Sequence, residues 1–234
     1  MDSIKIQHWN KIILCQKSYY TPAMVSVLDS IDNAIFSAEK ILKNDATSTV
    51  ALLKIDDQLL VVKRLNTKNW LHFFRRLFQN SRARKNWDNA STLCKMGIKT
   101  FKPIAILEER YGPLKGRSYF ICSYIEGIKA LEFFTHETVH EDIQSIAEKI
   151  TAMFNTLATA WISHRDLNLS NILLLDNQPW LIDLDSMKSH RWSWIAKRSA
   201  QRELNRFIRN CQETPEVPRT VISLFQSLFN KCNM

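Results

Sequence analysis

One polar stretch constrains the fold more than any other part of the chain. Residues 164–171 read His-Arg-Asp-Leu-Asn-Leu-Ser-Asn, and an apolar run at 172–175 follows directly. Asp166 and Asn171 therefore bracket a tight polar loop, and the apolar run after it is a candidate for a buried strand.

A second strand is predicted to return the chain to the same place. Residues 176–179, Asp-Asn-Gln-Pro, have turn chemistry, and the apolar run 180–182 ends at Asp183. The hairpin carries the carboxylates of Asp166 and Asp183 and the amide of Asn171 to the same end of a small sheet. Mg²⁺ prefers such hard oxygen ligands, usually one or two carboxylates together with phosphate oxygens. The pattern therefore predicts a site for Mg²⁺ and a triphosphate.

The composition is that of a globular chain with a basic balance. Of the 234 residues, 45% are hydrophobic and 24% are charged, so the chain can bury a sizeable core. Lysine and arginine exceed aspartate and glutamate by 32 − 23, which gives a net charge of +9. This balance favours an anionic partner: nucleic acid, an acidic membrane surface, or a phosphorylated or carboxylated substrate. No recognition motif supports nucleic acid.

The cysteines and the N-terminal residues indicate the cytoplasm. Cysteines stand at 15, 94, 122, 211 and 232 without a CxxC pair, and Cys94 and Cys122 lie in apolar surroundings. We therefore expect inert buried thiols in a reducing compartment. Residues 1–20 lack the apolar core of a signal peptide, and the uncharged run at 150–163 is too short and too polar to span a membrane.

The first part of the chain has helical periodicity. Apolar residues recur at three- and four-residue steps from Met24 to Ile41, and Lys40 and Lys43 suit a helix C-terminus. We expect residues 1–42 to be mainly helical, with residues 1–32 forming an N-terminal helical extension.

A hairpin that ends on a lysine is predicted next. The apolar runs 50–53 and 59–62 are separated by Asp56 and Asp57, which suit a tight turn, and Lys63 follows the second run.

Glycine is missing where a phosphate-binding loop would use it. The chain has four glycines, and the first is Gly97. A turn that covers phosphates before Lys63 would have to use residues 45–49, Asp-Ala-Thr-Ser-Thr. Their small side chains and hydroxyls can approach a phosphate, but they lack the backbone freedom of glycine.

A segment with interleaved aromatic and basic residues follows at 68–85. On a helix its apolar side chains share one side and its cations flank them, which is the pattern of an interfacial helix on an anionic bilayer. The same pattern fits a helix docked on the protein's own core with a solvated basic rim, and the sequence favours neither. The apolar residues are Trp70, Leu71, Phe73, Phe74, Leu77 and Phe78, and the arginines are Arg75, Arg76, Arg82 and Arg84.

The rest of the chain mixes helices and strands. The periodicities predict, in chain order, a helix over 86–96 that stops at Gly97, strands over 101–107 and 118–125, a link at 126–127, a long helix over 143–161 and, after residue 187, two short helices divided near Pro215 and Pro218.

A competing motif indicates a different class of enzyme. Residues 136–140 read His-Glu-Thr-Val-His, with His136, Glu137 and His140 matching the H-E-x-x-H pattern of zinc peptidases. Thr138 and Glu141 form a capping box, so a helix should start inside the motif, and the two histidines would not share a helical face. The zinc peptidase is therefore the least favoured alternative.

The assembled motifs resemble the lipopolysaccharide-core sugar kinases, the bacterial Kdo and heptose kinase group of the protein-kinase-like superfamily. The pattern H-R-D-x-x-x-x-N with a metal-binding aspartate after the next hairpin is typical of that superfamily. The resemblance covers about residues 47–190 and is carried by the stretches 48–51, 60–64, 83–90, 97–98, 124–127, 164–171 and 182–185.

The resemblance implies a protein-kinase-like α+β fold with two lobes. A small antiparallel sheet lobe would span residues 33–125, and a mainly helical lobe would span residues 126–234. The implied reaction is transfer of a phosphoryl group from ATP, with Mg²⁺, to a hydroxyl of a heptose or Kdo sugar. The substrate would be the lipid-anchored lipopolysaccharide core oligosaccharide at the cytoplasmic face of the inner membrane.

The resemblance also implies roles for single residues. Asp166 would accept or orient the proton of the sugar hydroxyl, and Lys63 would steady the α- and β-phosphates. The ligands of Mg²⁺ would be Asn171 and Asp183, and backbone groups near Ser123 and Ile125 would pair with adenine.

The chain departs from the kinase pattern at two places. Kinases pair the strand lysine with a helix glutamate, but the matching position here is Asn86, and Asp88 is the only acid between Lys63 and Glu108. Asp185 stands where protein kinases have glycine, and it is either a further metal ligand or a turn residue.

The basic tail and the missing parts keep further hypotheses open. Arg191, Arg198 and Arg202 are candidates to guide an acidic sugar, and segment 68–85 is a candidate to hold the enzyme on an anionic membrane. One rival function is a small-molecule phosphotransferase of the aminoglycoside or choline kind. A second rival, from another class, is a catalytically inactive kinase-like scaffold.

Overall fold

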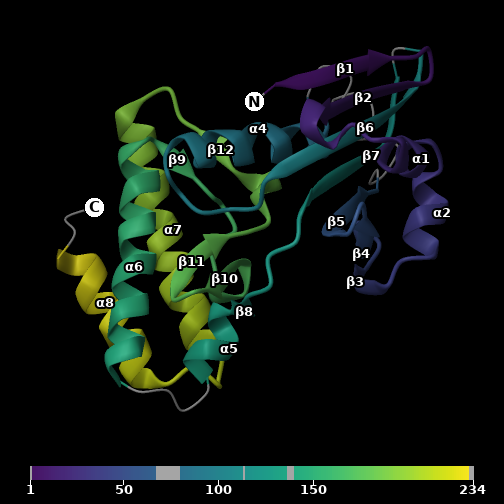
Figure 1. Cartoon of the computed structure of the whole chain (residues 1–234). Helices are drawn as coiled ribbons and strands as arrows, with labels where there is room; N and C mark the ends of the chain where they lie inside the picture. The colour runs from purple at the N-terminus through teal and green to yellow at the C-terminus, as the bar shows by residue number, and fades with distance from the viewer. Residues whose placement is uncertain (1, 67–79, 113, 136–139, 232–234) are drawn as a thin grey trace. The chain divides into compact units, whose positions relative to one another are not determined.

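The computed structural model divides the chain into two compact units (Figure 1). It describes residues 2–66, 80–112, 114–135 and 140–231. The first unit contains residues 1–92 and 101–124, and the second contains residues 93–100 and 125–234. Most of the amphipathic segment at 68–85 lies outside the described residues, so its two interpretations stay predictions.

The first unit is built on an antiparallel sheet of seven strands in the order β1-β2-β6-β7-β5-β4-β3 (Figure 1). The strands are β1 (Ser3–Gln7), β2 (Lys11–Gln16), β3 (Lys40–Asn44), β4 (Ser48–Ile55), β5 (Gln58–Leu65), β6 (Pro103–Tyr111) and β7 (Leu114–Ser123).

The prediction of a helical extension over residues 1–32 is wrong for its first half. Residues 3–7 and 11–16 are strands, and β2 pairs with β6, so this part of the chain continues the sheet. The physical reason is visible in the sequence: Ile4 and Ile6 alternate with polar residues, and the apolar run 12–15 is too short for a helix.

The helical periodicity is real only between residues 22 and 36. After the short 3-10 turn η1 (Lys17–Tyr19), helix α1 (Pro22–Asp29) starts with Pro22 in its first turn and with the Thr21 hydroxyl accepting a hydrogen bond from the Met24 N–H at 3.2 Å. Helix α2 (Ile31–Phe36) follows, and the chain then enters β3. The expected helix C-terminus at Lys40 and Lys43 is therefore an exposed strand instead.

Helices α1 and α2 cover one face of the sheet. Met24, Leu28, Ile31 and Ile35 are buried there in one cluster with strand residues such as Val62. Side chains alternate between the two faces of a strand, so Lys63 projects from the opposite face.

The central hairpin forms as predicted. Strands β4 and β5 are joined by Asp56 and Asp57, which have φ values of 49° and 60°. Positive φ at both turn residues is the geometry that fits the twist of a two-residue hairpin. Lys63 lies in β5 opposite Val50 on one side and Phe120 on the other.

Helix α4 (Arg82–Lys95) ends where the sequence indicated. Gly97 has φ of 75°, and the Ile98 N–H donates to the Leu93 carbonyl at 3.0 Å. A left-handed glycine closes helices in this way. The prediction for Cys94 is wrong, because this thiol is exposed on α4.

The second unit is mainly helical. Its core contains an aromatic cluster in which the Phe207 ring lies within 6 Å of the rings of Phe154, Phe225 and Phe229. The elements are α5 (Ala130–Thr135), α6 (His140–Thr159), α7 (Ser193–Glu213), α8 (Arg219–Lys231), the 3-10 turns η3 (Leu169–Asn171) and η4 (Leu184–Ser186), and the strands β8 (Ile128–Lys129), β9 (Ile162–Ser163), β10 (Ile172–Leu175), β11 (Gln178–Leu181) and β12 (Lys188–Ser189).

Two predictions about these helices have different outcomes. The break near Pro215 and Pro218 is confirmed, but the helix before it, α7, is 21 residues long and not short. Among the described residues, no helix is long and apolar enough to cross a bilayer.

The zinc-peptidase motif falls at the start of α6. The described part of this helix begins at His140, and the predicted start inside the motif stays a prediction. Residues 136–139 lie outside the described residues.

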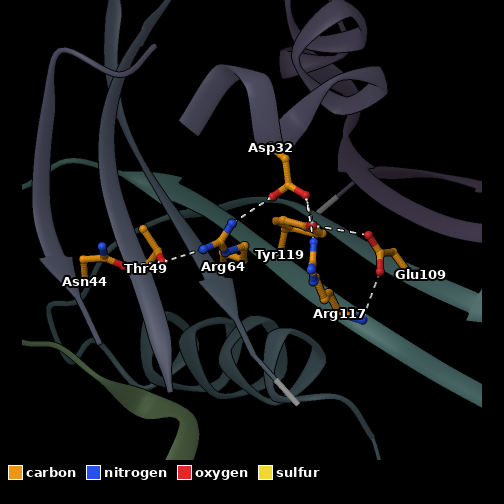
Figure 2. A network of polar contacts seen from close by, with 7 residues as sticks. All are labelled: Asp32, Asn44, Thr49, Arg64, Glu109, Arg117 and Tyr119. Atoms are coloured by element: carbon orange, nitrogen blue, oxygen red, sulfur yellow. Dashed lines mark hydrogen bonds and ion pairs between the residues drawn. The ribbon is translucent and has the colours of Figure 1, made fainter. Parts of the chain in front are cut away.

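A row of polar side chains crosses the sheet and ends at α2. Thr49, Arg64 and Tyr119 are direct neighbours on β4, β5 and β7. Figure 2 shows Asp32 of α2 reaching this row: Arg64 donates to its carboxylate at 3.3 Å, and the Tyr119 hydroxyl donates at 3.1 Å. Arg117 donates at 3.1 Å to the same oxygen as Tyr119. Burial raises the pKa of Tyr119, so this hydroxyl remains a donor.

We expect Asp32→Ala to lower the free energy of unfolding by about 1–2 kcal/mol, because Arg64 loses its charged partner in a half-buried position. Urea unfolding measures this. The control is Asp29→Ala, which removes an ion pair with Lys11 in which the aspartate is 61% exposed. It should cost less than about 1 kcal/mol. Equal losses for the two variants would contradict the role given to Asp32.

We expect three cysteines to resist alkylation in the folded protein. Burial raises the pKa of Cys15 to about 11 and the pKa values of Cys122 and Cys211 to about 12, so their thiolates are scarce at pH 8. Iodoacetamide treatment followed by peptide mass spectrometry should label exposed Cys94 first and the other three only after denaturation. Labelling of Cys122 in the native state would refute this.

Candidate functional site

The hairpin predicted after the polar loop is present. Strands β10 and β11 are joined by Asp176 and Asn177, with φ values of 53° and 54°. At its open end, the Ile182 N–H donates to the Asn171 carbonyl at 2.9 Å. Asn171 and Asp183 therefore lie at the same end of this small sheet.

The polar loop is held by its own side chains. Asn168 caps η3, because its Oδ1 accepts hydrogen bonds from the Asn171 N–H at 3.0 Å and from the Ser170 hydroxyl at 2.6 Å. The Asn171 amide nitrogen donates to the Asp166 carbonyl at 2.8 Å and to the Asp166 carboxylate at 3.3 Å. Asp166 and Asn171, which the sequence placed at the two ends of this loop, are in direct contact.

His164 ties the loop to the strand that delivers Asp183. Its side chain is fully buried, and its Nε2 lies 3.1 Å from the Ile182 carbonyl. Desolvation by burial lowers the pKa of His164, so the ring is neutral, and the carbonyl partner requires the proton on Nε2. The histidine thus fixes the spacing between the loop and residue 183.

Sequence reasoning missed the residue that anchors the loop from outside. Glu203 of α7 is buried, and its carboxylate accepts hydrogen bonds from the backbone N–H groups of His164, at 3.2 Å, and Arg165. Arg206, one turn further along α7, donates to the Arg165 carbonyl at 2.6 Å. Burial raises the pKa of Glu203, and the two N–H donors and the nearby arginines oppose that rise.

A signal for Glu203 exists in the sequence. Ala196, Phe207 and Cys211 are buried on α7 at the steps of one helical face, and Glu203 occupies the position between them. An acid inside an apolar stripe is buried and must have partners. Those partners are 38 and 39 residues away, so no local pattern names them.

Asp183 adopts a left-handed backbone conformation. Its φ of 58° and ψ of 62° lie in the region that aspartate and asparagine enter more readily than other residues with a side chain, and it precedes η4 without capping it through its side chain. Asp185 lies within η4 and is half-buried, and both interpretations made from the sequence stay predictions.

The first unit contains Lys63 and the two helix residues, Asn86 and Asp88, that the sequence analysis compared with the kinase pattern. Lys63 is half-buried on the sheet face that also carries Glu108, and Ser81, just before α4, donates to Glu108. Asn86 is buried and donates to the Arg82 carbonyl at 3.0 Å. Asp88 accepts from Arg84 at 3.1 Å along its own helix, so its carboxylate is already part of an ion pair.

The glycine-free turn is closed by a carboxylate. Between β3 and β4, Asp45 Oδ1 accepts from the N–H and hydroxyl of Thr47, both at 2.7 Å, and from the Ser48 N–H at 2.9 Å. These hydrogen bonds, led by that of the Thr47 hydroxyl, and the ion pair with Lys43 hold the pKa of Asp45 well below its usual range. The N–H groups of Thr47 and Ser48 therefore serve the turn itself.

The two residues predicted to contact adenine, Ser123 and Ile125, lie in different units. The Ser123 N–H donates to the Lys102 carbonyl at 3.0 Å, and its hydroxyl accepts from the Lys102 N–H at 2.9 Å. Ser123 is therefore no N–H donor for a base. Ile125 belongs to the second unit, at the start of its long stretch 125–234, and its side chain is buried.

Arg191 contacts its neighbour in the chain. Its guanidinium lies 5.6 Å from the centre of the Trp192 ring, and both residues are exposed.

The oxygen atoms of Asn171 and Asp183 are of the kind that Mg²⁺ takes as ligands. Among the described parts of the chain, no three His, Cys, Asp or Glu side chains gather as a metal cluster. Mg²⁺ needs only one or two protein oxygens beside phosphates and water. The Asn171 amide nitrogen faces Asp166, which leaves its oxygen as the atom to face a cation.

We expect Glu203→Gln to loosen the loop. The amide offers one acceptor and turns an NH₂ toward a backbone N–H, so the free energy of unfolding should fall by about 1–3 kcal/mol. Urea unfolding and hydrogen exchange of the peptide that contains His164 and Arg165 measure the effect. Glu213→Gln, at the exposed end of the same helix, should change stability by less than about 0.5 kcal/mol. Unchanged exchange in Glu203→Gln would rule out the anchoring role.

Comparison with known proteins confirms the resemblance seen in the sequence. No curated protein matches the chain. A solved structure titled "WaaP in complex with acyl carrier protein" matches with a TM-score of 0.62 and 16% identity, over 87% of this chain and 82% of that one. It shows the expected kinase-like fold, with an antiparallel N-terminal sheet and a helical C-terminal part. The profile of the Lipopolysaccharide kinase (Kdo/WaaP) family matches residues 44–227, and the chain belongs to this family.

Proposed function

We propose that the protein transfers a phosphoryl group from ATP to a sugar hydroxyl of the lipopolysaccharide core. Family membership implies a kinase that uses ATP. The observation that carries the finer proposal is the contact of Asn171 with Asp166, at the hairpin end that also bears Asp183.

Asp166 is the residue that accepts or orients the proton of the sugar hydroxyl. Its carboxylate is exposed, so an acceptor can reach it, and the Asn171 amide holds it in place. A group that moves a proton must lie within hydrogen-bond reach of it, and a fixed side chain loses little entropy when substrate binds.

Asn171 and Asp183 are the residues that would hold Mg²⁺. When bound, the ion would neutralise charge on the phosphates during transfer. The chain's own contribution is orientation. His164, through the Ile182 carbonyl, and the Ile182–Asn171 hydrogen bond fix the positions of both ligands before any nucleotide arrives.

Lys63 is the residue that would contact the nucleotide phosphates from the first unit. The turn held by Asp45 gives its N–H groups to its own carboxylate, so phosphate affinity should depend on the lysine ammonium more than on that backbone. The Ile125 backbone is the proposed partner of adenine, because the N–H of Ser123 is engaged.

The lipid-anchored core places the proposed reaction at the cytoplasmic face of the inner membrane. The net charge of +9 supports an anionic surface or substrate as partner. The choice between heptose and Kdo is a matter for substrate assays.

An inactive scaffold is the second candidate. It is favoured by two observations: the turn at 45–48 has no glycine, and Asp88 pairs with Arg84. Nucleotide binding separates the candidates, since a scaffold needs no Mg²⁺-dependent affinity for ATP.

We expect Asp166→Asn to reduce ³²P transfer from ATP to purified lipopolysaccharide precursors by about 100- to 10,000-fold, because the amide cannot accept the proton. ATP affinity should stay unchanged, as measured by thermal shift with Mg²⁺. The control is Asp142→Asn, an exposed carboxylate of α6 in the same unit. Wild-type protein without an ATP-induced shift would favour the scaffold, and full activity of Asp166→Asn would overturn the proposed role.

A further inference from the structure

A basic cavity lies in the second unit beside the polar loop. It has a volume of about 600 Å³, and its lining includes Arg165, Lys188, Arg198, Arg202 and Arg206. Arg165 directly precedes Asp166, so the cavity begins one residue from the proposed proton acceptor.

One face of α7 forms a wall of this cavity. Residues 195, 198, 199, 202 and 206 all line it, and steps of three and four residues fall on the same side of a helix. Three arginines of α7 therefore face one space. Other helix residues, such as Arg209, do not line it.

Most cations of the cavity have no carboxylate partner. Among the described residues that line it, the only acid is Glu203, whose carboxylate accepts two backbone hydrogen bonds and lies near Arg165 and Arg206. Over the described parts of the chain, Lys188, Arg198 and Arg202 have no ion pair. Like charges gathered in one concave space favour an anion there.

Other lining groups fit a sugar. The Trp194 ring lines the cavity and is 64% exposed, so it presents a flat apolar face. Ser186 and Ser199 add hydroxyls that can donate and accept hydrogen bonds. A ring, hydroxyls and arginine forks together match a saccharide that bears a carboxylate or a phosphate.

We propose that this cavity is the acceptor subsite, and that it binds an anionic group of the saccharide next to the hydroxyl that is phosphorylated. Arg198 and Arg202 bind the anionic group, and Trp194 packs on the sugar. This inference rests on the proposed function, because it assigns the acceptor of the same reaction. Of the three arginines that the sequence offered for this role, Arg198 and Arg202 line the cavity, whereas Arg191 lies over the Trp192 ring and does not line it.

The test is equilibrium binding without ATP. The probe is deacylated lipopolysaccharide core oligosaccharide in four forms: untreated, with its carboxylates methyl-esterified, dephosphorylated, and treated both ways. We expect the wild type to bind the untreated form at least ten-fold more tightly than the doubly treated form. The two singly treated forms identify which anion the cavity recognises.

The double variant R198Q/R202Q should bind the untreated and doubly treated forms alike. Both arginines are exposed, so thermal unfolding should be unchanged. Arg209→Gln is the matched control, since Arg209 is an exposed arginine of the same helix that pairs with Glu213. It should retain the preference of the wild type.

Several outcomes overturn the proposal: equal wild-type affinity for all four forms, equal losses in R198Q/R202Q and Arg209→Gln, or loss of ATP affinity in the double variant. If R198Q/R202Q lost binding to anionic phospholipid vesicles but kept the wild-type preference among the saccharides, the cavity would be a membrane contact instead. Because binding is measured without ATP, a protein that transfers no phosphate can still prefer the untreated saccharide, which would refute the proposed function but not the subsite. Conversely, a protein that transfers phosphate but binds all four forms equally would refute only the subsite.

Discussion

The geometry of the polar loop depends on one buried carboxylate. Glu203 accepts hydrogen bonds from the backbone N–H groups of His164 and Arg165, and Arg206 donates a hydrogen bond to the Arg165 carbonyl. A buried carboxylate is costly unless such donors satisfy it, so the helix and the loop stabilise each other. Arg165 keeps a left-handed φ of 70° within this clamp. Asp166 follows directly, and its position is set by the clamp on one side and by Asn171 on the other.

Helix α7, which carries Glu203 and Arg206, also lines the basic cavity beside the loop. Its buried face carries Glu203 and the aromatic core, and its other face presents arginines to the basic cavity. A single 21-residue helix thereby both anchors the loop that carries Asp166 and provides the arginines proposed to bind the charged group of the sugar. Because helix geometry is rigid, the two tasks are held at a fixed spacing.

In the first unit, carboxylates that accept several hydrogen bonds hold connections in which no glycine is present. Asp45 closes the turn before β4, and Asp32 joins α2 to the polar row on β4, β5 and β7 (Figure 2). Each carboxylate receives several donors, so a chain with few glycines still forms tight connections. The consequence is a turn that uses its own N–H groups, so the proposed phosphate contacts fall to side chains.

The sequence by itself determined the local elements whose signals are contained in a few neighbouring residues. The hairpins at 56–57 and 176–177, the stop at Gly97 and the contact of Asp166 with Asn171 follow from short-range turn and capping chemistry. It failed for β1 and β2, where alternation over few residues was outweighed by the helical period after residue 22. Only the tertiary structure decided the roles of Glu203 and Asp32, and only it gathered the arginines of α7, two of which the sequence had singled out, around one cavity. Their partners are tens of residues away, or their side chains converge only when a helix face meets a folded loop, and no local period encodes such meetings.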